Sequence, residues 1–272
     1  MKSFIADKNR KITKLALYHI EDLSYSGLLK ALRKKDVKVN GKRVNSDVTL
    51  EIGDVVEVYY TPTAAEKYIK IYADENVAVV YKKSGYLSQS VYDAIKLEYP
   101  TACFIHRLDR NTDGVMIFAL NGRAEKCLLD GFKERTFDKI YHAVVKGVPK
   151  EKSAILTAYL SKDKDAATVT ITDKKIDGST QIKTGYKVLE DRGDTSLLEV
   201  TLYTGKTHQI RAHLAHIGHP IIGDGKYGDF SLNERLGVKT QMLTAYSLTL
   251  NFDKDSPLNY LDKKTFVTIY KV

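Results

Sequence analysis

The chain has 272 residues, a length that suits one large domain or a large domain with a small appendage. Its 43 Lys and Arg residues outnumber 34 Asp and Glu residues, and the net charge of +9 suggests a polyanionic partner such as nucleic acid, although a soluble basic enzyme would also fit. No apolar run has the length of a membrane span, and the first residues lack the apolar stretch of a secretory signal. Cys103 and Cys127 are too few for a disulfide framework. We therefore expect a cytoplasmic protein that makes no membrane contact.

Residues 1–60 are predicted to form a separate small unit. A helix around Leu28 and Leu32 should end in basic residues. The stretch "DVKVNGKRV" follows, in which Val alternates with Lys as in a strand with one solvent-exposed face. Its Asn40-Gly41 pair is a strong signal for a β-hairpin, because both residues tolerate a positive φ. Another strand is predicted at "VVEVYY".

This order of elements resembles the S-four-like RNA-binding module, named for a ribosomal small-subunit protein. In that module the helix and the hairpin grip structured RNA, so the resemblance implies that basic residues there bind RNA: Arg33, Lys34, Lys35, Lys38, Lys42 and Arg43. The alternative interpretation is an ordinary helix–hairpin fragment. Residues 61–68, which begin with Thr61-Pro62-Thr63, are the predicted linker to a domain over residues 69–272.

The second domain reads mostly as strands. They are predicted at Ile69–Tyr72, Val77–Tyr81, Val115–Leu120, Lys139–Lys146, Ile155–Leu160, Ala167–Thr172, Lys183–Leu189, Ser196–Leu202, Met242–Leu250 and Phe266–Tyr270, with helices at Tyr92–Glu98, Arg123–Arg135 and His208–Ile217. Many successive strands with few helices predict an α+β fold. We expect a mixed, mainly antiparallel β-sheet with a few flanking helices, preceded by the small α/β module.

Three segments carry the candidate chemistry. The first is "HRLDRNTDG", residues 106–114, which places acids and bases directly before the apolar run "VMIFA". The second is "KIYHAVV", residues 139–145, and the third is "TGKTHQIRAHLAHIGHPIIGDGKYG", residues 204–228. In the third, Ile210 and Leu214 have helical spacing and define a buried face.

Arg211 follows that buried face by one residue, so it should lie at the edge of the core. A guanidinium there needs a carboxylate, because an unpaired buried charge is costly. Asp109, directly ahead of a buried strand, is the best candidate partner. Taken alone, a carboxylate in that position would be interpreted as part of a solvated turn.

Four histidines in the third segment, His208, His213, His216 and His219, raise the question of a metal site. The last one follows a Gly and has left the predicted helix. Zinc sites also commonly include carboxylate or cysteine ligands. We therefore expect no metal, and we interpret these histidines as surface or hydrogen-bonding side chains.

Together the three segments resemble the RluA-type pseudouridine synthases. That family carries "HRLDxxTSG", a Tyr in a "KxY" strand, and "TGRTHQIRxHLAxxGxPIxGDxxYG", of which the last is long and very specific. The likeness runs from about residue 70 to the C-terminus, and an S-four-like module often precedes this catalytic domain. The resemblance implies an RNA pseudouridine synthase. Such an isomerase breaks the bond from uracil N1 to ribose in structured RNA, rotates the base and rejoins it through C5.

The resemblance also implies roles for single residues. Asp109 is the essential carboxylate, acting either as a nucleophile or as a base. Tyr141 stacks on the target base, although a strand Tyr is otherwise usually a core residue. Arg107 takes the place that the flipped base leaves, and Ile210 lines the uracil pocket. Arg211 pairs with the catalytic carboxylate and orients it.

The chain departs from the family pattern at two places. Asp113 stands where the family has Ser, which puts an extra negative charge near RNA. The stretch "YKKSG", residues 81–85, replaces the family's "NKPxG" and lacks its Pro. These departures bear on the substrate more than on the type of reaction.

No cofactor is expected, since the isomerisation adds no atoms and needs no redox chemistry, and the chain has no Gly-rich nucleotide loop. We expect a monomer whose partner is ribosomal or transfer RNA. One alternative is a non-catalytic RNA-binding protein derived from the same family, but the intact Asp109, Tyr141 and Arg211 argue against it. Another is a glycoside hydrolase, which needs two carboxylates and suits the positive charge poorly.

Overall fold

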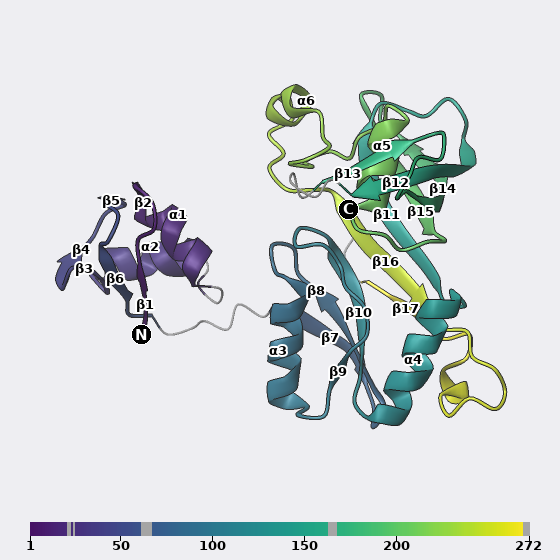
Figure 1. Cartoon of the computed structure of the whole chain (residues 1–272), viewed down its shortest axis with the longest axis horizontal. Helices are drawn as coiled ribbons and strands as arrows, with labels where there is room; N and C mark the ends of the chain where they lie inside the picture. Colours follow the sequence, from purple (N-terminus) through teal and green to yellow (C-terminus); the bar gives the residue numbers. More distant parts are fainter. Residues whose placement is uncertain (21–22, 24, 61–66, 163–167, 269–272) are drawn as a thin grey trace. The chain divides into compact units, whose positions relative to one another are not determined.

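The computed structural model describes residues 1–20, 23, 25–60, 67–162 and 168–268. The chain divides into two compact units, Met1–Lys67 and Tyr68–Val272, each with its own hydrophobic core (Figure 1). Most of the predicted linker, residues 61–66, lies outside the described residues. Among the residues that are described, no helix is both long and apolar enough to cross a bilayer.

The smaller unit packs two helices against short strands. The helices are α1 (Ile12–His19) and α2 (Tyr25–Arg33). Four strands form a sheet in the order β1-β6-β3-β4: β1 (Lys2–Ile5), β3 (Val37–Val39), β4 (Lys42–Val44) and β6 (Val55–Val58). Two further strands, β2 (Arg10–Lys11) and β5 (Thr49–Leu50), pair with each other. Ile12, Leu28 and Val56 are fully buried in its core. Helix α1 was not predicted from the sequence; it is short, and its N-cap residue makes no side-chain hydrogen bond.

The hairpin predicted at Asn40-Gly41 is confirmed. The two residues have φ of 50° and 77°, and they join β3 to β4. The Asn40 side chain also donates to Asp54 (2.7 Å) and accepts a hydrogen bond from the Val55 backbone N–H (2.9 Å). These bonds fix the hairpin to the start of β6.

The larger unit is built on one sheet whose main path has the order β13-β12-β14-β15-β11-β16-β10-β8-β7. Two short strands pair at its sides, β9 with β10 and β17 with β16. The strand bounds are β7 (Tyr68–Ala73), β8 (Val77–Lys82), β9 (Cys103–Phe104), β10 (Asp113–Ala119), β11 (Asp138–Lys146), β12 (Ser153–Lys162), β13 (Val169–Thr172), β14 (Thr180–Asp191), β15 (Thr195–Leu202), β16 (Leu243–Thr249) and β17 (Thr265–Val267). Every pairing among these described strands is antiparallel except β10 with β16. The predicted α+β class with a mainly antiparallel sheet is confirmed.

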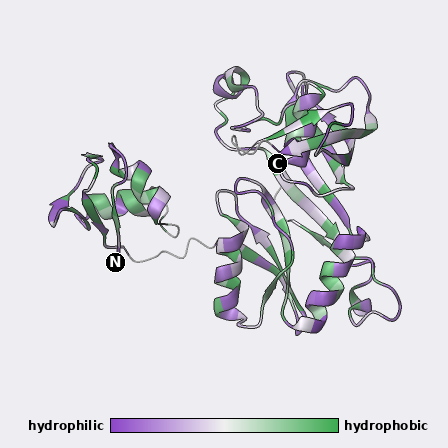
Figure 2. Cartoon of the chain, in the orientation of Figure 1, coloured by the Kyte–Doolittle hydropathy of each residue, from purple (hydrophilic) through white to green (hydrophobic). Residues whose placement is uncertain are grey.

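Strand β10 explains the unbroken apolar run after the first segment, because both of its faces are covered. Val115 and Ile117 pack in the core beneath α4 (Gly122–Glu134), whereas Met116 and Phe118 pack in the core beneath α3 (Ser88–Glu98). Both helices expose polar residues on their outer sides (Figure 2). The strand is therefore held rigidly from both sides.

The other helices lie in the second half of the unit. Helix α5 (Gln209–His216) buries Ile210 and Leu214 against β11 and β15, as its spacing predicted. Helix α6 (Phe230–Arg235) is short and was not predicted. A single 3₁₀ turn, η1, spans Asn259–Leu261.

The predicted elements differ from the observed ones mainly at their ends. Helix α3 starts at Ser88 rather than at Tyr92, and β14 is longer at both ends than predicted. Ala167 and the last two residues of the strand predicted at Phe266–Tyr270 lie outside the described residues. The short strand β9 was not predicted, because it is set by pairing with β10, which a local pattern does not show.

Candidate active site

The end of the first segment is anchored where β10 runs parallel to β16. Asp113 pairs with Thr244, and Gly114 with Ala245. Gly114 has a φ of +117°, and a Cβ on it would lie 2.3 Å from the carbonyl oxygen of Ala245. Only Gly permits this approach. The loop that carries Asp109 is thereby brought to the middle of the sheet.

That loop is also held by side chains. The Gln241 amide donates to the Thr112 hydroxyl (2.8 Å), and the Thr112 N–H donates to the Asp109 carbonyl (3.2 Å). From the other side, Lys82 at the end of β8 donates to the carbonyl oxygen of Arg110 (3.0 Å). The backbone on which Asp109 sits is therefore fixed at three points.

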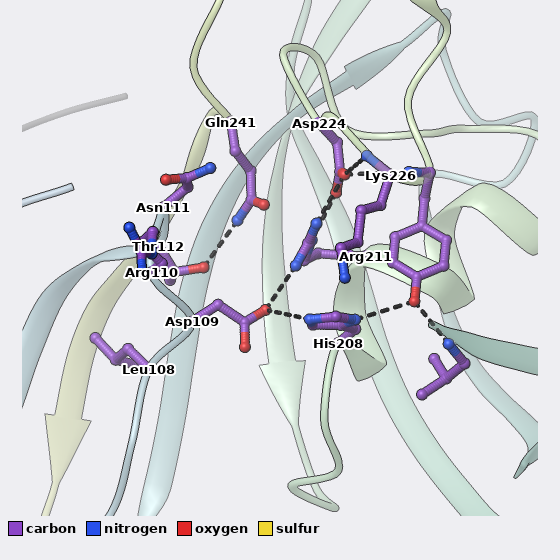
Figure 3. Close-up of polar contacts among 12 residues, drawn as sticks. Leu108, Asp109, Arg110, Asn111, Thr112, His208, Arg211, Asp224, Lys226 and Gln241 are labelled. Carbon is purple, nitrogen blue, oxygen red and sulfur yellow. Dashed lines mark hydrogen bonds and ion pairs between the residues drawn. The ribbon is translucent and has the colours of Figure 1, made fainter. Parts of the chain in front are cut away.

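Arg211 lies between two carboxylates (Figure 3). Its Nη1 donates to Asp109 Oδ2 at 2.9 Å, which is the contact that the sequence analysis anticipated. Its Nε and Nη2 form a two-pronged contact with Asp224, at 2.7 and 2.9 Å. Burial alone would raise the pKa of the Asp224 carboxyl, but the hydrogen bonds and charge of Arg211 lower it. The guanidinium is charged and its orientation is set by Asp224.

Asp224 is the main residue that the sequence analysis missed. Its side chain is fully buried, and its Oδ1 also accepts from the backbone N–H groups of Lys226 and Tyr227. A buried guanidinium has five N–H donors, more than one carboxylate satisfies. The number of N–H donors on Arg211 could therefore have indicated a second acidic partner.

A cavity of about 170 Å³ opens beside the Asp109 carboxylate. The five residues proposed for catalysis and substrate binding all line it: Arg107, Asp109, Tyr141, Ile210 and Arg211. The structure therefore brings together side chains from the three segments that the sequence analysis singled out. Arg107 is exposed at the cavity, whereas Ile210 is buried in its wall.

Tyr141 reaches the cavity from β11. It packs against two hydrophobic clusters, one of which contains Leu108 and the other Val200. Burial, followed by the nearby charge of Asp109, raises the pKa of its hydroxyl, so the side chain is neutral at physiological pH. It presents an aromatic surface without charge next to a carboxylate.

His106, in contrast, has a structural role. Burial and then the charge of Lys139 lower the pKa of His106 to about 3, so the ring is neutral. Its Nε2 accepts from the Ile117 backbone N–H at 3.1 Å, and its ring stacks on Phe132. It joins the segment before Asp109 to strand β10.

The four histidines of the third segment have separate partners. His208 contacts the Tyr227 hydroxyl, His213 the Thr184 hydroxyl, His216 the Asp173 carboxylate and His219 the Lys146 carbonyl. Among the described residues, no group of three or more His, Cys, Asp or Glu side chains is arranged to hold a metal ion.

The two departures from the family pattern lie side by side. Asp113 accepts hydrogen bonds from the hydroxyls of Tyr81 (2.8 Å) and Thr244 (2.5 Å), so its charge is bound within the sheet. Lys82 is fully buried, and its amine donates to the carbonyls of Lys83, Tyr86 and Arg110. Burial, partly offset by the charges of Asp113 and Asp109, lowers the pKa of Lys82 to about 8.

The basic residues proposed to bind RNA lie in the smaller unit. They occupy the end of α2, the turn after it, and the β3–β4 hairpin: Arg33, Lys34, Lys35, Lys38, Lys42 and Arg43. All are exposed except Lys38, which is half-buried and donates to the Tyr59 hydroxyl.

The sequence matches the family model described as RNA pseudouridylate synthase over residues 76–216, which includes Asp109, Tyr141 and Arg211. That match spans more than half of the chain. The chain belongs to the RNA pseudouridylate synthase family. It is therefore an isomerase that forms pseudouridine in RNA, as the sequence analysis predicted.

Relatives of known name agree with this assignment. The chain is 31% identical over 238 residues to a ribosomal large subunit pseudouridine synthase C of Vibrio vulnificus, which covers 77% of this chain and 74% of that protein. It is 31% identical over 246 residues to an uncharacterized RNA pseudouridine synthase of Chlorobaculum parvum, covering 80% and 75%. The solved structure of human RNA pseudouridylate synthase domain containing 1 matches with a TM-score of 0.63 and 27% identity, over 72% of this chain and 83% of that one.

Proposed function

We propose that this pseudouridine synthase uses Asp109 as its essential carboxylate. The observation that carries the proposal is the row Asp109–Arg211–Asp224 at the edge of the cavity. Arg211 occupies Oδ2 of Asp109 and leaves Oδ1 toward the substrate. Both possible roles, attack on the sugar and proton abstraction, require a carboxylate in a fixed orientation.

The cavity residues receive the uridine. Flipping a base out of its stack costs a few kcal/mol, and stacking on an aromatic ring returns roughly 1–3 kcal/mol. Tyr141 supplies that ring, Ile210 forms the apolar wall, and the exposed Arg107 fills the space that the flipped base leaves in the RNA. The location of these side chains around Asp109 supports the assignment.

The smaller unit is proposed to bind structured RNA through the basic residues of α2 and the β3–β4 hairpin. The net charge of +9 and the exposure of these side chains support this role. Several relatives are named for the large ribosomal subunit, so ribosomal RNA is the proposed substrate. Mapping pseudouridines in cells with and without the protein tests it. Sites lost from transfer RNA alone would overturn it.

The enzyme is further proposed to act as a cytoplasmic monomer without cofactor or metal. Activity on RNA should survive exhaustive treatment with EDTA, because the histidines near the site have other partners. Loss of activity that zinc alone restores would contradict this.

The test of Asp109 is the Asp109→Asn variant, which keeps the shape of the side chain and removes its charge. Pseudouridine formation should be lost while RNA binding is largely kept. The exposed Asp130 on α4 provides a matched control, since Asp130→Asn should leave activity unchanged. Turnover of Asp109→Asn within about tenfold of the wild type would show that another group does the chemistry. A wild-type chain that binds RNA without forming pseudouridine would favour the non-catalytic alternative.

A further inference from the structure

His208 has an unusual backbone conformation next to the active site. It is the N-cap residue of α5, with φ of 54° and ψ of 16°, in the left-handed region that only a few per cent of residues other than Gly adopt. No side-chain cap compensates for it. Strained residues that persist in a well-packed structure commonly serve a site, because the surroundings must hold them there. The conformation turns the His208 ring toward the cavity that Asp109 borders.

The ring lies between two groups. Its Nε2 is 3.8 Å from Oδ2 of Asp109 (Figure 3). Its Nδ1 is 3.0 Å from the hydroxyl oxygen of Tyr227. Tyr227 comes from the same segment, just beyond Asp224, and its ring also faces the Arg211 guanidinium. Asp109 and Tyr227 are thus connected through one imidazole.

The contact with Tyr227 favours one of the two neutral tautomers of His208. The backbone N–H of Val169 donates to the Tyr227 hydroxyl oxygen at 2.8 Å, so the hydroxyl proton remains available for another acceptor. His208 Nδ1, at 3.0 Å, is placed to accept it. Burial lowers the pKa of His208, so the ring is neutral and a ring that accepts at Nδ1 carries its proton at Nε2. In this tautomer the N–H lies on the side of Asp109.

We propose that His208, oriented by Tyr227, is a positioning residue that donates through Nε2 to Oδ2 of Asp109. This rests on the proposed role of Asp109. Arg211 holds the same oxygen at 2.9 Å, so two donors converge on Oδ2 and leave Oδ1 for the reaction. The distance of 3.8 Å is longer than a hydrogen bond, and such contacts commonly tighten only when substrate binds.

The test compares two amide replacements of His208. In Gln the amide nitrogen can take the place of Nε2, whereas the shorter Asn reaches only the position of Nδ1. His208→Gln should therefore keep much of the single-turnover rate, and His208→Asn should lose about ten- to a hundredfold, the range seen when a group that orients a metal-binding side chain is removed. Asn tolerates the left-handed conformation better than Gln does, so a purely structural role would give the opposite order.

The role of Tyr227 is tested by a double-mutant cycle. Tyr227→Phe should lower the rate of the wild type by about tenfold with little change in KM, since the tautomer is no longer fixed. In the His208→Ala background the same change should have little further effect. An equal loss in both backgrounds would mean that Tyr227 acts through Val169 or Arg211 instead.

The matched control is His216→Gln, on the outer face of the same helix, where the ring contacts the exposed Asp173. It should react at the wild-type rate. If Asp109→Asn is inactive while His208→Asn reacts as the wild type does, the inference about His208 is wrong and the role of Asp109 stands. If Asp109→Asn itself stays active, the proposed function fails first.

Discussion

At the scale of single residues, Arg211 makes one contact that concerns the stability of the fold and another that concerns the chemistry of the site. Its two-pronged contact is with Asp224, whose side chain is fully buried, and its single contact is with Asp109 at the cavity. A charge buried without a partner is costly, whereas a carboxylate next to a cavity still meets water. Asp224 and Asp109 should therefore respond differently to substitution.

Replacing Arg211 with Leu should destabilise the protein by on the order of 3–5 kcal/mol, because the Asp224 carboxylate loses its partner. Combining Arg211→Leu with Asp224→Asn should cost less than the sum of the two single changes. Urea unfolding of the four proteins gives the coupling free energy. Strict additivity would show that the two side chains do not interact.

Arg211→Lys keeps the charge but loses the planar fork that fits a carboxylate. It should be more stable than Arg211→Leu and still turn over slowly, because a lysine cannot hold Asp109 and Asp224 together. The comparison uses the same unfolding curves plus a single-turnover assay. A lysine variant with the wild-type rate would mean that charge alone suffices.

Lys82 should make stability depend on pH. Its folded pKa of about 8 lies below the ordinary 10.5, so between these values the unfolded chain keeps a proton that the folded chain has lost. The free energy of unfolding should therefore rise with pH in this window, by roughly 2–3 kcal/mol relative to Lys82→Met. Urea unfolding at pH 7.5, 9 and 10 measures it, with the exposed Lys133→Met as the control. A constant difference between wild type and Lys82→Met would contradict the lowered pKa.

The sequence indicated some of these residues and not others. It pointed to Asp109 and Arg211, because a charged side chain beside a buried helix face needs a partner. It did not show that Asp224 is buried, since that depends on how the loop after α5 folds back. Nor did it show the left-handed conformation of His208, because this position holds neither Gly nor Asn, the residues that commonly indicate that conformation.

At the scale of elements, long periodic segments were the predictable part. β10 and α5 follow from apolar runs and helical spacing, and the Asn40-Gly41 hairpin follows from local turn chemistry. The insertion of β16 between β10 and β11 was not predictable, because it depends on pairing between residues far apart in the chain. The site lies where β16 is inserted, so the sequence identified the site residues but not how they are arranged in space.

Gly114→Ala tests the close contact between β10 and β16. The added methyl group would lie 2.3 Å from the carbonyl oxygen of Ala245, at a φ of +117°. We expect a loss of stability on the order of 3 kcal/mol or more, together with reduced activity. Gly193→Ala is the control, because its φ is +77° with nothing within 4 Å, so only a backbone cost of about 1 kcal/mol applies. Equal losses in thermal or urea melts would show that contact with Ala245 is unimportant.

At the scale of the whole molecule, the division into Met1–Lys67 and Tyr68–Val272 predicts that the larger unit folds alone. Deleting residues 1–67 should leave a cooperative unfolding transition, weaken RNA binding and flatten its dependence on salt, since fewer phosphates are neutralised. Replacing Arg33, Lys34 and Lys35 with Gln in the full chain should flatten the salt dependence without removing the unit. An unchanged slope in both proteins would mean that the smaller unit does not touch RNA.

The position of β16 also has a consequence for how the enzyme is made. Strands β7, β8 and β10 leave the ribosome first and β11 to β15 follow, yet within the main sheet path the two groups are joined through β16, at residues 243–249 (Figure 1). Asp109 belongs to the first group, whereas Arg211 and Asp224 come after the second. A nascent chain that stops before residue 243 lacks the strand that brings these side chains together. The Asp109 carboxylate is thus held next to Arg211 only after residues 243–249 have been made.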